Sequence, residues 1–252
     1  MSMFNFVEAY KKLLQPTFLL IGIFVVAVTV SVANAGSLPI SEATGTFSGV
    51  EENENAGHSI AFVGDVNGDG MDDMLVGAPQ NKENGLKAGA AYLVFGEYPV
   101  PEGSSSLKNA DVTFLGESNF DFAGTVVASL GDVNGDDISD FAITAPYAEN
   151  VSGKIYLFFG QKGSWQNQIH LTDADASFIG EAEGDSAGIQ IAAIGDINND
   201  GYDDFITSAP RHDAQYVESG KVYVILGKKS GWEKNVSLTD VSISFVGEYE
   251  WD

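Results

Sequence analysis

Residues 64–73 read Gly-Asp-Val-Asn-Gly-Asp-Gly-Met-Asp-Asp, and close variants return at residues 131–140 and 195–204. Each copy follows a short apolar run and precedes another, which ends in Ala-Pro. The copies recur about every 65 residues, a period too long for ankyrin or leucine-rich repeats and long enough for a four-stranded propeller blade. The sequence therefore predicts a repetitive β protein organised around three acidic loops.

A second landmark, Phe-x-Gly, recurs with the same period, at Phe47, Phe114, Phe178 and Phe245. We therefore expect an all-β fold, a β-propeller of four-stranded blades, with three complete repeats and the start of a fourth. The repeats are expected at 47–113, 114–177, 178–244 and, in part, 245–252. A propeller closes with typically four to eight blades, so the sequence is expected to be cut short within its fourth repeat.

Strands are expected in the first repeat at residues 59–63, 74–77, 90–95 and 112–115. These runs are rich in Val, Tyr, Phe and Leu and alternate poorly, as strands buried on both faces do. Helical periodicity is confined to the N-terminal segment.

The first 35 residues have the features of a secretory signal peptide. Lys11 and Lys12 precede an apolar run at 17–32, which ends in Ala-Asn-Ala at residues 33–35. This interpretation leaves 36–252 as the folded part; an uncleaved membrane anchor is the alternative. Both predict a secreted or cell-surface protein, and no other stretch is apolar and long enough to insert in a membrane as a helix.

The charge and the absence of cysteine restrict the partners. The chain has 36 Asp and Glu against 12 Lys and Arg, a formal net charge of -24, which opposes binding to nucleic acid. With no cysteine, an exported protein must obtain its stability from packing, repetition or metal ions. Small cations are the partners that this composition favours.

The acidic loops have the spacing of calcium sites. Counting the first aspartate as position 1, oxygen-bearing side chains stand at positions 1, 3, 5 and 9, and position 7 offers a backbone carbonyl, a pattern that wraps a hard cation. We expect about one Ca²⁺ per complete repeat. The predicted ligands are Asp65, Asn67, Asp69, Met71, Asp73; Asp132, Asn134, Asp136, Ile138, Asp140; and Asp196, Asn198, Asp200, Tyr202, Asp204.

Other interpretations of the loops are weaker. An EF-hand requires a glutamate at position 12, where this chain has Val76, Ile143 and Thr207. Ordinary Asn-Gly turns would explain the glycines but not three carboxylates in each loop, because like charges about 4 Å apart repel by about 4 kcal/mol at an effective dielectric near 20. Asp137 replaces glycine at position 6, so the second loop departs from the pattern.

Phe-x-Gly, the Asp-x-Asn-x-Asp loop and Gly-Ala-Pro together resemble FG-GAP repeats, which occur in the β-propeller of integrin α subunits and in secreted bacterial proteins. The resemblance runs from Phe47 to Asp252. It implies a seven-bladed propeller, with calcium between the first and second strands of a blade and partners mainly on the opposite face. Thr144 and Ser208 depart from the glycine of Gly-Ala-Pro.

The sequence favours a binding protein over an enzyme. Gly-Asp-Ser-Ala-Gly at 184–188 matches a nucleophile elbow, but a strand-like run follows it where the elbow requires a helix. Trp165 and Trp232 occupy one repeat position, so packing is preferred over sugar stacking. The loop after the third Ala-Pro offers the best candidate contacts with a ligand, namely Arg211, His212, Asp213 and Tyr216.

The leading hypothesis is therefore an adhesion or ligand-binding module whose partner is an extracellular protein or glycan. The alternatives are a non-catalytic accessory propeller of a larger secreted hydrolase, and a lectin. Further propeller blades, or further copies of the chain, are expected to cover the open edges of a three-bladed fragment.

Overall fold

A computed structural model describes residues 45–98, 103–213 and 217–248. The predicted signal segment at 1–35, the candidate contact Tyr216 and the end of the partial fourth repeat lie outside these residues. Over the described part of the chain, no helix is both long enough and apolar enough to cross a membrane.

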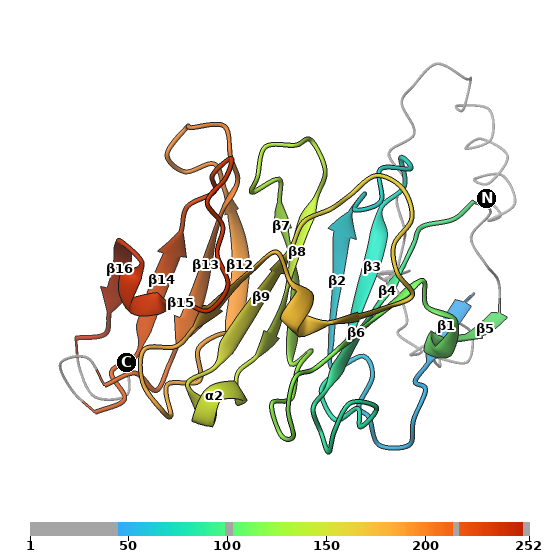
Figure 1. Ribbon diagram of the computed structural model, residues 1–252, viewed down its shortest axis with the longest axis horizontal. Helices are drawn as coiled ribbons and strands as arrows, with labels where there is room; N and C mark the ends of the chain where they lie inside the picture. Colours follow the sequence, from blue (N-terminus) through green and yellow to red (C-terminus); the bar gives the residue numbers. More distant parts are fainter. Residues whose placement is uncertain (1–44, 99–102, 214–216, 249–252) are drawn as a thin grey trace, which may run out of the picture. The chain divides into compact units, whose positions relative to one another are not determined.

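Three antiparallel sheets, each built from four consecutive repeat strands, form the body of the protein (Figure 1). We call them blades 1 to 3. Blade 1 contains β2 (Ser59–Gly64), β3 (Asp73–Ala78), β4 (Ala90–Val94) and β6 (Val112–Leu115). Blade 2 contains β7 (Val126–Gly131), β8 (Asp140–Ala145), β9 (Lys154–Phe158) and β11 (Ala176–Ile179). Blade 3 contains β12 (Gln190–Gly195), β13 (Asp204–Ala209), β14 (Lys221–Ile225) and β16 (Ile243–Val246).

The predicted strands of the first repeat fall on β2, β3, β4 and β6, and the all-β, propeller-type fold is confirmed. The central strands are buried on both faces, as their apolar runs predicted: β8 and β9 have no exposed residue. The Phe-x-Gly strand is the last of the four antiparallel strands of each blade; β6, for example, pairs with β4 of the same blade. A blade is therefore offset from the sequence repeat that starts at the phenylalanine.

Each Phe-x-Gly strand also has a short parallel partner from the following repeat, which the sequence analysis did not predict. β10 (Gln168–His170) pairs with β6, β15 (Val236–Ser237) pairs with β11, and β5 (Gly103–Ser106) pairs with β1 (Gly45–Ser48). A single 3-10 turn follows each of these short strands, at Leu107–Asn109, Leu171–Asp173 and Leu238–Asp240. A short helix, α2 (Ala148–Val151), follows the Ala-Pro of blade 2.

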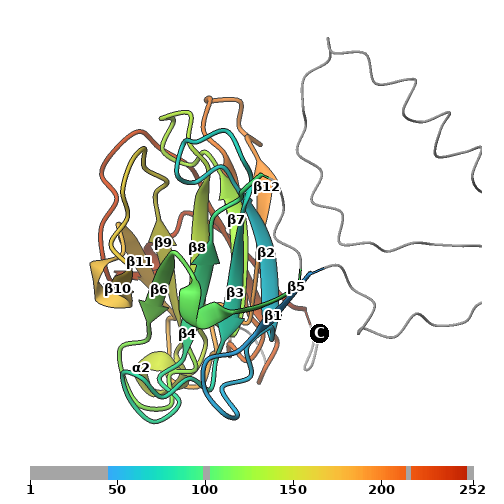
Figure 2. The ribbon, with the colours of Figure 1, turned by 90° about the vertical axis from the view of Figure 1, so that its right-hand side faces the viewer.

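The hydrophobic core lies between neighbouring blades. The first strands β2, β7 and β12 gather on one side of the molecule, with β6, β10 and β11 on the other (Figure 2). Phe114 of blade 1 packs on Phe141 and Phe158 of blade 2, with ring centroids 5.5 and 4.7 Å away. Burial of each such ring stabilises the fold by about 2 to 3 kcal/mol. The aromatic contacts that form the core thus also join neighbouring blades.

Trp165 belongs to this packing, as predicted. Its ring lies 6.3 Å from that of Phe114 and 6.1 Å from that of Phe141. Trp232 repeats the arrangement one blade further on, against Phe159 and Phe178. Packing, rather than stacking on a sugar, accounts for the recurrence of tryptophan at this repeat position.

Candidate functional site

The three acidic loops connect the first and second strands of their blades and lie at the same end of the sheets, at the upper side of Figure 1. A bulge interrupts each hairpin just before its loop, between Phe62 and Gly64 in blade 1. Gly64, Gly131 and Gly195 close these bulges with φ of 74, 80 and 67°, a conformation that glycine adopts without a Cβ clash. The bulge turns each loop out of its sheet.

The aspartate at position 1 folds the loop around its own carboxylate. Asp65 Oδ1 accepts hydrogen bonds from the N–H groups of Gly68 and Asp69 at 2.7 and 3.0 Å, and Oδ2 accepts from Gly70 N–H at 2.8 Å. Asp132 makes the same three contacts in the second loop. Asp196 makes two of them in the third. The pattern is a property of the repeat.

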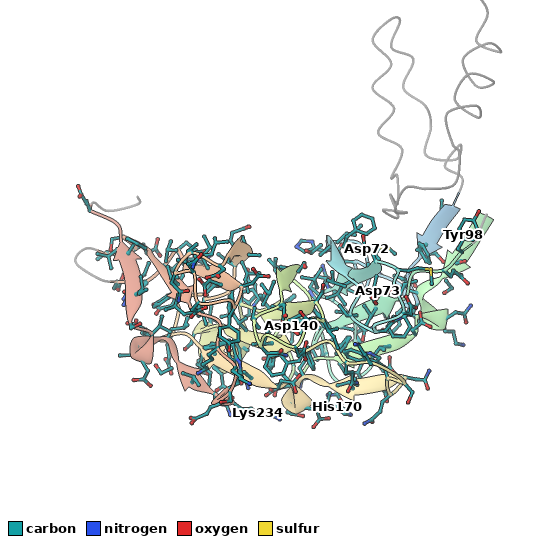
Figure 3. The ribbon with its side chains drawn as sticks, turned by 90° about the horizontal axis from the view of Figure 1, so that it is seen from above. Asp72, Asp73, Tyr98, Asp140, His170 and Lys234 are labelled. Atoms are coloured by element: carbon teal, nitrogen blue, oxygen red, sulfur yellow. The ribbon has the colours of Figure 1, made fainter. Side chains whose placement is uncertain are left out.

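The aspartate at position 9 anchors the loop to the end of the third strand of its blade. Asp73 is fully buried; its Oδ2 accepts from Val66 N–H and its Oδ1 from Gly96 N–H, both at 2.9 Å. Asp140 and Asp204 are equally buried and bind the equivalent pairs of backbone amides. Asp73 and Asp140 lie in neighbouring blades (Figure 3).

Burial, and to a smaller degree neighbouring negative charge, raises the pKa of two of these carboxyl groups. Burial raises the pKa of Asp73 to about 6; hydrogen bonds from Gly96 and Val66 oppose the rise, and the charges of Asp69 and Asp65 add to it. Burial likewise raises the pKa of Asp140 to about 8, with Asp136 and Asp132 adding to the effect. A cation in the loop would relieve this repulsion.

Position 3 tests whether the donor set fits a cation. The Asn134 amide nitrogen donates to Asp136 Oδ2 at 3.1 Å, but its Oδ1 is buried and has no hydrogen-bond partner. An unsatisfied buried carbonyl oxygen is costly, and coordination of a cation would satisfy it. Carboxylate and amide oxygens are the ligands that Ca²⁺ takes, so the loop residues fit the ion.

The carboxylates of each loop are nonetheless turned onto backbone N–H groups. Over the residues that the structure describes, no group of three Asp, Glu, His or Cys side chains is already gathered as a metal site. In each loop, the predicted ligands therefore lie in or beside one turn, but their oxygens do not point at a common centre.

Position 6 has the backbone conformation that the sequence analysis required. Gly70 and Gly201 both have φ of 92°, and Asp137 adopts the left-handed conformation with φ of 66°. A non-glycine residue pays roughly 1 to 2 kcal/mol for this conformation. The second loop thus keeps the shape of the other two at a local cost in strain.

Position 8 links neighbouring loops, a role that the sequence did not reveal. Asp203 of blade 3 accepts a hydrogen bond from Asp132 N–H at 2.9 Å, and its own N–H donates to Asp132 O at 3.0 Å. Position 8 of the second loop is Ser139, whose side chain lies against Gly64 of blade 1. The only available signal was that this position alternates between Asp and Ser among the repeats.

The Ala-Pro loops form the opposite end of the blades. Just ahead of the recurring Ala-Gly, each blade has a buried carboxylate: Glu54 in blade 1, Asp121 in blade 2 and Asp185 in blade 3. In blade 1, the Glu54 carboxylate accepts hydrogen bonds from the Tyr92 hydroxyl at 2.7 Å and the Asn81 amide at 2.9 Å. These networks hold the loops rather than expose them.

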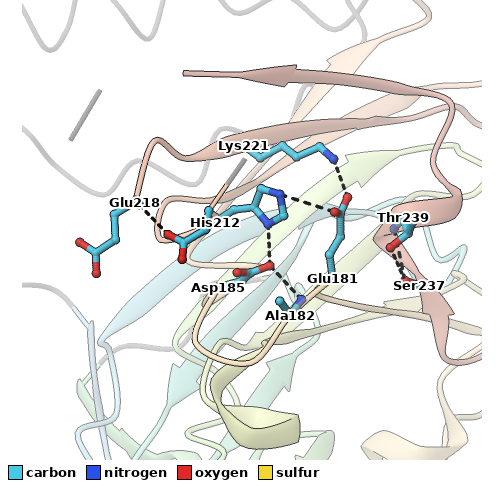
Figure 4. Close-up of polar contacts among 9 residues, drawn as sticks. Glu181, Ala182, Asp185, His212, Glu218, Lys221, Ser237 and Thr239 are labelled. Atoms are coloured by element: carbon cyan, nitrogen blue, oxygen red, sulfur yellow. Dashed lines mark hydrogen bonds and ion pairs between the residues drawn. The ribbon is translucent and has the colours of Figure 1, made fainter. Parts of the chain in front are cut away.

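In blade 3 the same network contains His212, and this corrects the prediction of an exposed contact there. His212 is buried; its Nδ1 lies 2.8 Å from Asp185 Oδ2 and its Nε2 lies 3.5 Å from Glu181 Oε2 (Figure 4). Lys221 donates to the other Glu181 oxygen at 2.6 Å. Although burial raises the pKa of Glu181, Lys221 and His212 bring it below its usual value. Of the other candidates, Arg211 and Asp213 are exposed.

Beside these loops, blade 2 has an open hollow of ≈ 460 Å³. It is lined by carboxylates and aromatic rings, including Glu117, Phe120, Asp121, Tyr147 and Glu149. Its backbone is strained at several non-glycine positions with positive φ, which are Phe120, Phe122, Glu149, Asn150 and Val151. The values at Phe120 and Phe122 recur at Asn53 and Asn55 of blade 1 and so belong to the repeat, whereas Glu149, Asn150 and Val151 follow the Ala-Pro of blade 2. The sequence analysis did not single out these residues.

The elbow-like segment has no catalytic geometry. Ser186 is buried, with φ of 55°, in the loop between β11 and β12, and its hydroxyl has no hydrogen-bond partner. The neighbouring His212 is committed to Asp185 and Glu181. The serine thus has neither the strand-to-helix turn nor the adjacent base that a nucleophile needs.

Comparison with known proteins agrees with this architecture. The FG-GAP repeat family matches residues 56–94, 123–158 and 187–225, which are the first three strands of blades 1, 2 and 3. Integrin alpha-IIb of Mus musculus is 32% identical over 160 residues, 61% of this chain and 14% of the relative. Integrin alpha-PS2 of Drosophila melanogaster is 26% identical over 207 residues, 78% of this chain and 14% of the relative.

Integrin alpha ina-1 of Caenorhabditis elegans is 25% identical over 229 residues, 84% of this chain and 19% of the relative. The chain therefore spans less than a fifth of the length of these relatives. Repeat matches, strand order and sequence similarity agree with one another, and the chain is an integrin α-like FG-GAP repeat protein.

Proposed function

We propose that this protein is a secreted or cell-surface adhesion module, in which each acidic loop holds a calcium ion and the Ala-Pro side of the blades binds an extracellular partner. The FG-GAP repeats and the similarity to integrin α chains support an adhesion-type extracellular propeller. The observation that carries the calcium proposal is the repetition of one donor set in three loops at the same end of three blades. In the second loop the unsatisfied Asn134 Oδ1 adds to it, whereas the equivalent oxygens of Asn67 and Asn198 accept backbone N–H groups.

In each loop, the residues at positions 1, 3, 5 and 9 would hold the ion, together with the carbonyl at position 7. The ion would offset the negative charge of the loop and draw its oxygens together. Three of its donors, at positions 1, 3 and 5, are side chains of a single turn, and the donor at position 9 begins the second strand. The ion would therefore join both strands of the first hairpin. Its role in this proposal is structural.

Calorimetric titration of Ca²⁺ into metal-free protein tests this proposal. Two or three ions should bind, with dissociation constants on the order of 0.1 to 1 mM, which the concentration of extracellular calcium would fill. Mg²⁺ at the same ionic strength should bind more weakly, because it demands a tighter octahedral shell. Failure to bind any Ca²⁺ would mean that the loops are plain turns.

The hollow in blade 2 is the contact surface that we propose for the partner. Carboxylates beside exposed aromatic rings suit a basic side chain, which both the charge and the ring faces attract. Burial raises the pKa of Asp121 to about 6; the charges of Glu117 and Glu149 add to the rise, and the hydrogen bond from Ser118 and the charge of Lys154 oppose it. Lys154 is paired with Glu117 at 2.8 Å, so Glu149 is the lining carboxylate that we propose for a basic ligand. A protein ligand with an exposed lysine or arginine therefore fits better than a neutral glycan.

An array of immobilised peptides that vary in Lys and Arg content, read beside a glycan array, tests this surface. Basic peptides should be retained, and Tyr147→Ala or Glu149→Gln should weaken retention by about tenfold, the loss of roughly 1.4 kcal/mol. Glu233→Gln, at an exposed position in blade 3, removes the same charge elsewhere and should leave retention unchanged. Retention of glycans alone would favour a lectin.

A further inference from the structure

The acidic loops of neighbouring blades are covered in different ways at the two junctions. At position 4 of the second loop, Gly135 has no room for a Cβ, because the ring of Tyr202 lies in that place. Tyr202 is position 7 of the third acidic loop. At position 4 of the first loop, the stem of Lys162 covers Gly68 in the same way, but Lys162 follows β9 and belongs to no acidic loop. Of these two loops, the second is thus covered by another acidic loop and the first is not.

The residue that follows Tyr202 adds a second contact with the same loop. The Asp203 carboxylate accepts a hydrogen bond from Asp132 N–H at 2.9 Å, and Asp203 N–H donates to the Asp132 carbonyl at 3.0 Å. Asp132 is position 1 of the second loop. Two consecutive residues of the third loop therefore hold positions 4 and 1 of the second.

The equivalent residues at the junction of blades 1 and 2 do not make these contacts. Ile138 corresponds to Tyr202, and its side chain is buried against Gly160 of its own blade. Ser139 corresponds to Asp203, and among the described residues no hydrogen bond joins it to the first acidic loop. The protein thus contains one linked and one unlinked pair of neighbouring loops.

Tyr202 also belongs to the third predicted calcium site. Its N–H donates to Asp200 Oδ1 at 3.1 Å, and its carbonyl is the predicted donor at position 7. An ion held by positions 5 and 7 would fix the backbone of Tyr202, and with it the side chain that covers Gly135. A ligand that orders a segment lowers the entropic cost of ordering it for a second ligand. Binding at the third loop would therefore favour binding at the second.

We propose that the second and third acidic loops bind calcium cooperatively through Tyr202 and Asp203, which act as positioning residues, and that the first loop binds independently of the second. The proposal rests on the proposed function, in which each loop holds a calcium ion. The coupling is reciprocal, so that filling either loop raises the affinity of the other by the same factor. Repulsion between the ions does not oppose it, because each loop brings three ligand carboxylates against the two charges of one ion and stays negative.

Calcium titration of full chains that keep chosen sites measures this coupling. Alanine at position 5 disables one loop, and the three variants, Asp69→Ala, Asp136→Ala and Asp200→Ala, all change exposed residues. Each variant alone keeps two sites, and each pair of variants combined in one chain keeps a single site. For independent sites, the overall association constant of a two-site chain equals the product of the two single-site constants.

The two junctions should give different results in this titration. Asp69→Ala keeps the second and third loops, and its overall constant should exceed the product by about tenfold, a usual size for coupling between sites. Asp200→Ala keeps the first and second loops, and its overall constant should equal the product. The second chain is thus the internal control for the first.

Variants of Tyr202 separate positioning from a general effect on stability. In the Asp69→Ala chain, Tyr202→Ala removes the ring from the second loop but keeps the carbonyl at position 7. It should abolish the coupling and leave the single-site constant of the third loop unchanged. Tyr202→Phe keeps the ring and should keep the coupling; its loss there would contradict the ring contact. Lys162→Ala in the Asp200→Ala chain is the matched control, because it uncovers the first loop and should create no coupling.

Amide hydrogen exchange gives a readout that needs no ion in the second loop. In the chain with Asp69→Ala and Asp136→Ala, calcium fills the third loop alone, and its addition should slow the exchange of N–H groups at 132–137. The chain with Asp136→Ala and Asp200→Ala keeps the first loop alone and should show no such protection. Equal protection in both chains would mean that calcium orders the protein as a whole, and the contact between the loops would not be the cause.

The titrations also distinguish failure of the coupling from failure of the calcium proposal. If the parent chain binds no calcium, both are wrong. If it binds three ions but the second and third loops obey the product rule, the coupling is wrong and the calcium sites remain. An excess over the product of the same size for the first and second loops would also overturn the proposal, because that junction lacks the contacts of Tyr202 and Asp203.

Discussion

Two aspartates of the same loop have different surroundings, and this difference separates structural residues from residues whose main role is to hold an ion. Asp73, at position 9, is buried and holds the amides of Val66 and Gly96. Asp69, at position 5, is exposed and accepts from Met71 N–H within its own turn. The fold depends on the Asp73 carboxylate whether or not an ion is present, whereas the Asp69 carboxylate is important mainly as a ligand of the ion.

We therefore expect Asp69→Ala and Asp200→Ala to lower the melting temperature in calcium and to matter little in chelator. Asp73→Ala should lower it in both conditions, because two buried amides lose their acceptor, at a cost of roughly 1 to 3 kcal/mol each. Thermal melts of the three variants with and without calcium check this. Equal losses for Asp69→Ala in the two conditions would contradict an ion at that loop.

Asp121 supports a second prediction at the residue scale. Burial raises its pKa to about 6 in the folded chain, above its ordinary value near 4, so the folded state binds its proton more tightly than the unfolded state. This contribution to stability is fully present below about pH 4 and is lost as the pH rises through 6. Denaturant titrations in chelator should show a steeper fall of stability over this range for the parent than for Asp121→Asn; parallel profiles would contradict the raised pKa.

Among the elements, the connection between neighbouring acidic loops has the clearest consequence. Asp203 holds the backbone of Asp132, the first residue of the second loop, through two hydrogen bonds. Order imposed on the third loop is thereby passed to the second. At the junction of blades 1 and 2, Ser139 occupies the position of Asp203. The junction of blades 2 and 3 therefore has a carboxylate at the position where the junction of blades 1 and 2 has a serine hydroxyl.

Asp203→Ser should destabilise the protein by about 1 to 2 kcal/mol and weaken calcium binding at the second loop as well as the third. Asp72→Ser is the matched control: it removes the same charge at position 8 of the first loop, which has no preceding acidic loop among the described residues. Calorimetric titration of both variants distinguishes the two effects. If Asp72→Ser weakens binding as much as Asp203→Ser, loss of charge alone explains the result.

The elements also show which parts of the fold could be predicted from the sequence. β2, β3, β4 and β6 could be predicted because long apolar runs bounded by glycine and acidic turns repeat three times. β10 and β15 could not, since strands of three and two residues have no periodicity and form only because a neighbouring blade supplies an edge. For the same reason the sequence did not show that His212 is buried: its partners Glu181 and Asp185 come from another loop, which only the fold brings near.

At the scale of the whole molecule, charge and repetition act together. The chain has a formal net charge of -24, and many of its carboxylates stand at one end of the blades. Mutual repulsion of these groups destabilises the compact state, and three divalent ions bound there would oppose it at the points of greatest crowding. Specific binding differs from general screening, because sodium chloride screens every carboxylate and fits none of the loops.

We therefore expect 1 mM CaCl₂ to raise the melting temperature of metal-free protein well beyond the effect of sodium chloride at equal ionic strength. Three sites with dissociation constants of about 0.1 mM would each add about 1.4 kcal/mol, since binding stabilises by RT ln(1 + [L]/Kd). At roughly 2 to 4 °C per kcal/mol for a chain of this size, the rise is on the order of 10 °C. Scanning calorimetry in matched buffers measures it. If sodium chloride produced the same rise, calcium would be acting as a diffuse counterion, and the three loops would owe their repetition to turn geometry alone.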